Sequence, residues 1–197
     1  MKIEKNKLNA SFNEWEEQLT NYSLPSWEHL PDLELYMDQV ISLIEKYLKI
    51  YIKVTGSERL ITSSMINNYV KLSIIPAPNK KKYSRIHLAY LLIICTLKQT
   101  LNMATIQKII PVDLNEAEVK DTYNSFIKNQ HKAYLYVLEH TKAVSDPILN
   151  FDGENTERIS DLIMQVAASA NIFKILTDKI SNLSITDTET EKNHEQW

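Results

Sequence analysis

Glycine is almost absent from this sequence, with only Gly56 and Gly153 among its 197 residues. Phosphate-binding loops and dinucleotide-binding turns need several glycines, at positions where the backbone must approach a phosphate closely. No such loop can be drawn in this chain.

Cysteine is equally scarce. The single Cys95 excludes an intrachain disulfide and any cysteine-based zinc cluster. It lies among leucines and isoleucines, where a buried and inert thiol is expected rather than a sensor. The five histidines have no ligand spacing: His29, His87, His131, His140 and His194. No nucleophile motif is present either, and we expect no metal, no cofactor and no enzymatic activity.

A long apolar run is also missing. The N-terminal stretch MKIEKNKLNASFNEWEE is charged and unlike a signal peptide, and the longest apolar run, near LAYLLIIC, is too short to span a bilayer. The sequence predicts a soluble, cytoplasmic protein that does not contact a membrane.

Acidic residues are missing from one region. Residues 59–112 contain no Asp or Glu, although the chain has 25 of them, and they contain eight of the 22 Lys and Arg. A one-sided charge of this kind is typical of a surface that binds a polyanion. The alternative is a partly buried helical core with a few solvated lysines.

Helical periodicity dominates and predicts an all-α protein. A capping box at Ser11 and Glu14 predicts a first helix, and Pro31 predicts the start of a second helix that reaches about Lys49. The apolar stripe of this second helix consists of Leu33, Met37, Val40, Ile44 and Tyr47.

The central region predicts a helix, a basic turn and a second helix. Thr62 is a suitable N-cap for a helix over 62–72, two prolines follow it, and Ser84 can cap a helix that is apolar on nearly every face. A short helix around Ile106 ends at Pro111.

Two long helices are expected after Pro111. A capping box at Asp113 and Glu116 predicts the first, to about Thr141, and Thr156 begins the second. We therefore expect four parts: an N-terminal helical arm (1–30), a winged helix-turn-helix (31–112), a helical dimerisation or effector region (113–183) and a disordered tail (184–197).

Helix 62–72 is the candidate recognition helix. Its apolar residues (Met65, Ile66, Tyr69 and Leu72) should face the core. The other face should be exposed and contact DNA in the major groove: Ser63, Ser64, Asn67, Asn68 and Lys71. The turn at 79–83 is the candidate wing, whose predicted contacts with phosphates come from Lys80, Lys81, Lys82, Tyr83 and the adjacent Arg85. A cation in the first turn of a helix opposes the helix dipole, so Arg85 indicates an anion nearby.

The stretch INNYVKLSIIP resembles, without gaps, the MerR-type pattern of leucine, arginine, two tyrosines, three variable residues, glycine, two leucines and proline. Asn67 and Asn68 stand where MerR proteins carry arginine and tyrosine, and Ser73 stands where they carry glycine. KYSRIHLAYLLIICTLKQTLNMATIQKII resembles the MerR stretch that follows. The wider stretch from LPSWEHLPDLELYMDQV to IQKII is similar to a bacterial domain-of-unknown-function family numbered 1836, itself considered MerR-like. The resemblance implies a small β wing beside the helices and a sequence-specific regulator that binds double-stranded DNA.

The last helix carries a coiled-coil seam, formed by Ile159, Leu162, Val166, Ser169, Phe173, Leu176, Ile180 and Leu183. The MerR resemblance implies a homodimer through this pair of long helices, with room for a small-molecule effector. The seam alone equally allows these helices to pack back on their own domain. A second functional hypothesis is a helical protein-interaction module that has kept the MerR-like fold but no longer binds DNA.

Overall fold

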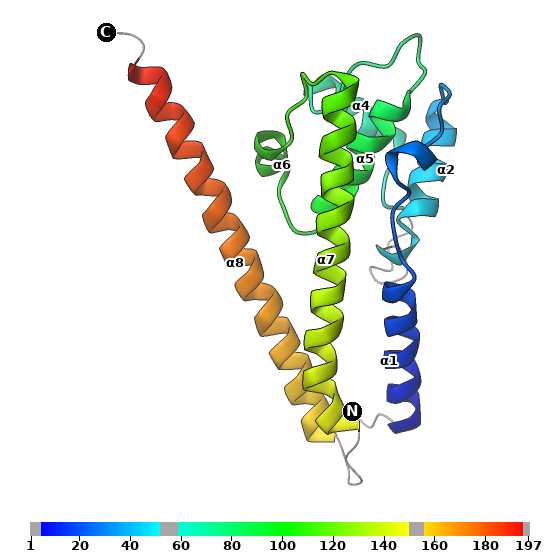
Figure 1. Cartoon of the computed structure of the whole chain (residues 1–197), viewed down its shortest axis with the longest axis vertical. Coiled ribbons are helices and arrows are strands. Elements are labelled where there is room, and N and C mark those ends of the chain that lie inside the picture. Colours follow the sequence, from blue (N-terminus) through cyan, green and yellow to red (C-terminus); the bar gives the residue numbers. More distant parts are fainter. Residues whose placement is uncertain (1–4, 52–58, 150–155, 195–197) are drawn as a thin grey trace. The chain divides into compact units, whose positions relative to one another are not determined.

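The computed structural model describes residues 5–51, 59–149 and 156–194, with side chains described up to Leu183 in the last helix (Figure 1). Its elements are, in order, α1 (Lys5–Thr20), the 3-10 helix η1 (Trp27–His29), α2 (Met37–Tyr47), α4 (Ser63–Lys71), α5 (Arg85–Leu97), α6 (Met103–Ile109), α7 (Glu116–Leu149) and α8 (Thr156–His194).

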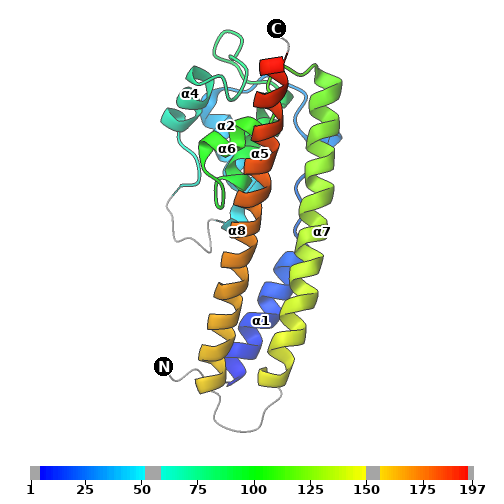
Figure 2. The same ribbon diagram turned by 90° about the vertical axis from the view of Figure 1, so that its left-hand side faces the viewer.

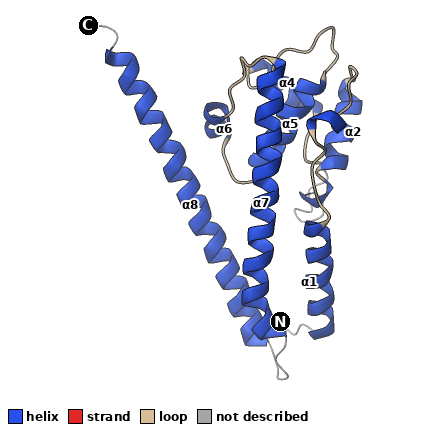
Figure 3. Cartoon of the chain, in the orientation of Figure 1, coloured by secondary structure: helices blue, strands red, loops and turns tan. Residues whose placement is uncertain are grey.

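The prediction of an all-α protein is confirmed. Within the described ranges every regular element is a helix, and Figure 3 shows only helices and loops there. Extended backbone pairs at two isolated antiparallel bridges, between Leu35 and Tyr83 and between Asn79 and Lys82.

The chain divides into two compact units, one formed by residues 23–130 and the other by residues 1–22 with 131–197. Helix α7 contributes its first half to one unit and its second half to the other. The domain boundaries expected from the sequence, after residues 30 and 112, do not coincide with these divisions.

Helix α5 is the centre of unit 23–130, as its apolar composition predicts. Every residue from His87 to Cys95 is buried. The surrounding helices contribute fully buried side chains such as Val40 and Ile44 from α2 and Ile66 from α4. These helices gather around α5 in Figure 2. A helix that is apolar on all sides must be covered on all sides.

The segment that precedes α2 is fixed to the first half of α7. The rings of Trp27 and Tyr123 meet edge to face at 6.4 Å, and the Tyr123 hydroxyl donates to the Pro25 carbonyl at 2.9 Å. Lys120 forms an ion pair with Glu28 at 2.8 Å, and this hydrogen bond lowers the pKa of Glu28 to about 2. These contacts explain why residues 23–30 belong to this unit and not to a separate arm.

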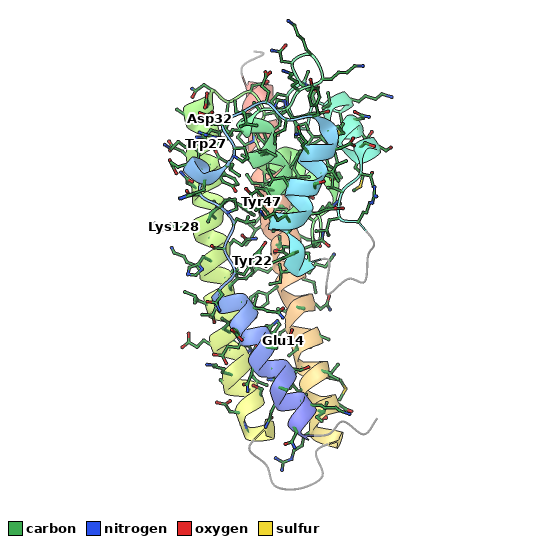
Figure 4. All side chains as sticks on the ribbon, turned by 90° about the vertical axis from the view of Figure 1, so that its right-hand side faces the viewer. Glu14, Tyr22, Trp27, Asp32, Tyr47 and Lys128 are labelled. Carbon is green, nitrogen blue, oxygen red and sulfur yellow. The ribbon has the colours of Figure 1, made fainter. Side chains whose placement is uncertain are left out.

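In the other unit, α1 packs on the second half of α7. Tyr22 contacts Tyr134 with ring centroids 5.6 Å apart, Glu16 pairs with Lys142, and Leu138 is buried. Figure 4 shows the side chains of α1, with Glu14 and Tyr22 labelled.

Several predicted helix limits are wrong. Helix α1 begins at Lys5, so Ser11 lies inside it and is not a cap. Helix α2 begins at Met37 and not near Pro31, because Leu35 is held extended by its pairing with Tyr83. As a result, Leu33 precedes the helix and is exposed, so it is not part of the apolar stripe in which it was predicted.

The long helices also differ from expectation. The cap of α7 is Asn115, whose side chain accepts from the Glu118 N–H while Glu118 accepts from the Asn115 N–H; the predicted cap Asp113 lies outside the helix. Helix α7 continues past Thr141 to Leu149. Helix α8 begins at Thr156 as predicted and continues to His194, across most of the segment 184–197 that was expected to be disordered.

Helix α4 ends in a left-handed residue that is not glycine. Ser73 has φ 52°, its N–H donates to Val70, and the Ile74 N–H donates to the Tyr69 carbonyl at 2.8 Å. These two bonds form a Schellman motif, in which glycine is the preferred residue at the left-handed position. The absent glycine of the MerR-type pattern therefore coincides with a position of backbone strain.

We predict that Ser73→Gly raises the free energy of unfolding by about 0.5–1 kcal/mol, because glycine adopts this φ without the steric cost of a Cβ atom. Chemical denaturation measures the change. Ser73→Ala is the control, since it removes the hydroxyl and keeps the Cβ. If alanine stabilises the protein as much as glycine does, the gain does not come from the backbone.

Candidate nucleic-acid interface

Helix α4 presents a polar face to solvent. The Thr62 side chain accepts from the Met65 N–H at 3.3 Å and caps the helix as the sequence predicts. Ile66 and Tyr69 are buried. The five residues predicted to contact DNA are all exposed: Ser63, Ser64, Asn67, Asn68 and Lys71. Leu72 was expected in the core, but it is about half exposed because the helix ends there.

The candidate wing is a tight two-residue hairpin turn. Asn79 and Lys82 exchange both backbone hydrogen bonds, at 3.1 and 2.8 Å. Lys80 and Lys81, at the tip, have φ of 46° and 65°. Positive φ at both central residues is typical of a type I′ turn, which normally takes Asn-Gly. Both lysine side chains are exposed, so two positive charges are concentrated at the tip of this turn.

Tyr83 was predicted to contact DNA, and its position argues against that role. The side chain is 3% exposed, and burial raises the pKa of its hydroxyl. Its backbone N–H and C=O pair with Leu35 at 2.8 and 2.9 Å. Tyr83 therefore anchors the base of the wing to the core.

Lys82 and Arg85 are engaged within the chain. Lys82 Nζ lies 3.6 Å from Glu34 Oε2 and 5.8 Å from the centre of the Tyr36 ring. Arg85 lies 3.4 Å from Asp32 Oδ1, and its guanidinium is 5.6 Å from the centre of the Trp27 ring. Figure 4 labels Trp27 and Asp32 in the segment before α2. The anion that was expected near Arg85 is therefore a carboxylate of the protein itself, that of Asp32.

Three further cations of the acid-free segment fall into two groups. Lys98 donates to the Leu60 carbonyl and so fixes the chain ahead of α4. Lys71 and Lys108 are exposed, as are the tip lysines. Gln107, beside Lys108, donates to the Leu72 carbonyl at 3.1 Å, which brings α6 to the end of α4. Lys108 was not among the residues predicted to contact DNA.

His87 contacts the two residues that connect the wing to α5, Tyr83 and Ser84. Its Nδ1 accepts from the Ser84 N–H at 3.0 Å, as Glu or Gln does in a capping box, and its ring meets Tyr83 edge to face at 5.3 Å. Nε2 is buried without a hydrogen bond. Burial lowers the pKa of His87, an effect that the nearby carbonyls of Ala77 and Pro76 partly oppose.

Sequence reasoning missed the acidic partners of the basic region. Asp32 and Glu34 lie outside the acid-free window and were assigned to the start of a helix. The alternation of DLELY, with Asp32, Glu34 and Tyr36 at every second position, was the available signal for an extended segment.

A metal site needs several ligating side chains close together. No group of three or more His, Cys, Asp or Glu side chains among the described residues could hold a metal ion. Cys95 is buried, which raises the pKa of its thiol to about 11, so it is almost entirely protonated at neutral pH.

The predicted seam on α8 is only partly covered by its own chain. Ile159 and Leu162 are buried, and the other five apolar residues of the seam are about half exposed: Val166, Phe173, Leu176, Ile180 and Leu183. By length and composition alone, Arg158–Leu183 could cross a membrane, with a mean hydropathy of 1.3. A single helix of this kind is weak evidence for a membrane span.

In a comparison with known families, the family described as a domain of unknown function (DUF1836) matches residues 25–136. Neither the curated proteins nor the solved structures give a match. The matched residues include every element of the candidate interface.

We predict that wild-type stability falls as the pH drops below about 6.5, because the depressed pKa of His87 makes the unfolded chain bind the proton more tightly. The His87 contribution is complete above the unfolded pKa and is lost as the pH falls through the folded pKa. His87→Gln can keep the cap and does not titrate. Denaturation midpoints at pH 5.5 and 7.5 should differ less for this variant than for wild type, and equal differences would contradict the assignment.

Proposed function

The chain belongs to the DUF1836 family, and because that description assigns no activity, we propose from the geometry that it is a sequence-specific DNA-binding transcription regulator. The observation that carries the proposal is the exposed polar face of α4 beside a hairpin turn with two lysines at its tip. In a winged helix-turn-helix, a short helix enters the major groove while a wing contacts the adjacent phosphates. The proposal assigns α4 and the turn at 79–83 to these two roles, as the MerR resemblance implies.

Each part has a distinct role in this proposal. Asn67 and Asn68 are the base-reading residues, since an amide can pair with both N6 and N7 of adenine. Ser63, Ser64 and Lys71 contact base edges or phosphates. Lys80 and Lys81 neutralise phosphates and set affinity without reading sequence. Such a regulator acts in the cytoplasm, where DNA and a reduced Cys95 coexist.

We further propose that the regulator is a dimer whose interface includes α8. Its exposed large apolar side chains are Ile163, Met164, Val166, Ile172, Phe173, Ile175, Leu176, Ile180 and Leu183, and α7 adds Leu135, Tyr136 and Val137.

A second copy explains this surface better than a bilayer does. Lys174 and Asp178 pair at 3.2 Å within the apolar stretch, and Lys179 is exposed beside them. Each charge near the centre of a membrane costs about 2.5–3.5 kcal/mol on insertion scales, whereas the edge of a helix bundle leaves it in water.

The alternative is a protein-interaction module. It is favoured by the exposed apolar side chains of unit 23–130, namely Leu33, Tyr36, Leu72 and Ile109, and by the internal pairing of Lys82 and Arg85. In that case, the basic surface meets an acidic partner protein, and DNA affinity is weak and independent of sequence.

We predict that Lys80→Asn with Lys81→Gly lowers affinity for all duplexes and flattens the salt dependence by roughly 0.9 per lost phosphate contact. Asn-Gly is the preferred type I′ pair, so the turn remains while its charge is removed. Fluorescence anisotropy over a salt series measures both effects.

The matched control is Asn67→Ala with Asn68→Ala. It should relax the preference between operator and scrambled duplexes while leaving the salt slope unchanged. An unchanged slope for the lysine variant would remove the wing from the interface, and full discrimination by the asparagine variant would remove both residues from base reading.

We predict that Leu176→Glu with Ile180→Glu converts the dimer to a monomer, because two buried carboxylates at the seam would be desolvated without partners. Light scattering coupled to size exclusion measures the mass. Asn171→Glu, at an exposed polar position of α8 outside the predicted seam, is the control for added charge and should remain dimeric. A wild-type protein that is monomeric at micromolar concentration would contradict the dimer.

A further inference from the structure

An extended acidic segment, residues 32–36, lies against the basic wing. Leu35 pairs with Tyr83 through two backbone hydrogen bonds of 2.9 and 2.8 Å in antiparallel orientation. Leu35 is buried, so this pairing fixes the segment on the core. The acidic segment is therefore held beside the second arm of the hairpin turn.

Asp32, Glu34 and Tyr36 lie on either side of Leu35, which is the residue that pairs with the wing. All three meet cations of the wing base. Asp32 lies 3.4 Å from Arg85, Glu34 lies 3.6 Å from Lys82, and the Tyr36 ring lies under the Lys82 ammonium. Two carboxylates thus neutralise the two cations, while Lys80 and Lys81 stay exposed to solvent at the tip.

Arg85 is held in a fixed orientation with donor capacity to spare. Its side chain is 17% exposed and lies against the Trp27 ring, whereas the Asp32 side chain is 87% exposed. A guanidinium carries five N–H donors in a fork that matches phosphate as well as carboxylate. Exchanging this exposed carboxylate for a phosphate would leave Arg85 in place.

We propose that Lys82 and Arg85 form a phosphate subsite that Asp32 and Glu34 occupy when no polyanion is bound. The acidic segment is an internal competitor for the backbone of nucleic acid, and the identity of that polyanion rests on the proposed function. Exposed ion pairs are weak in water, so a dense array of phosphates displaces them. The competition lowers affinity for every sequence and makes binding depend more on the base contacts of α4.

The experiment is a four-protein cycle: wild type, Asp32→Asn with Glu34→Gln, Lys82→Gln with Arg85→Gln, and all four changes together. Each protein is eluted from immobilised heparin with salt and titrated against a labelled scrambled duplex. Asp121→Asn with Glu139→Gln is the control for net charge, since both residues are exposed on α7. The surface pair Glu34→Gln and Lys82→Gln repeats the cycle if Arg85→Gln impairs folding.

Neutralising the acidic segment should delay elution from heparin, raise duplex affinity at least roughly threefold, and steepen the salt slope by up to about 1.8, or 0.9 for each cation released. The gain should vanish when Lys82 and Arg85 are already replaced, which identifies a coupled interaction. No gain, an equal gain without the two cations, or an equal gain from the α7 control would overturn the inference. If the heparin cycle behaves as expected but no protein prefers its native operator, the subsite stands and the sequence-specific function fails.

Discussion

Helix α5 has no polar side, and this constraint determines the arrangement of unit 23–130. Every residue from His87 to Cys95 is buried, so α2, α4 and the wing base must cover the helix together. At its N-terminus, Ser84 and His87 share a cap, and Tyr83 packs on the His87 ring. The wing starts from this fixed point, which orients its tip relative to the core.

The distribution of charge around the wing follows from the same arrangement. Pairing of Leu35 with Tyr83 covers one side of the core and holds the segment in which Asp32 meets Arg85 and Glu34 meets Lys82. The basic region is therefore divided into tip lysines open to solvent and base cations held by carboxylates. Under the proposed function, this division would moderate affinity for polyanions and leave selectivity to α4.

The sequence predicted the parts that local chemistry controls. Thr62 and Ser84 cap the helices they were expected to cap, and the apolar composition of α5 correctly indicated its burial. Long-range pairing was not predictable: the extended segment before α2, and with it the partner of Arg85, depends on Tyr83 almost fifty residues away. Tyr83 was predicted to contact DNA because it follows three lysines. The charge of neighbouring residues does not indicate which side chains of an extended segment face the core. The roles of α4 and the wing in DNA binding stay predictions.

The most direct test of the central claim is fluorescence anisotropy with a duplex from the protein's own upstream region and a scrambled duplex of equal composition, over a series of salt concentrations. The account predicts tighter binding to the native duplex at every salt concentration, with a steep salt slope for both. Weak and equal binding to the two duplexes would contradict sequence-specific recognition by α4 and would favour the protein-interaction module.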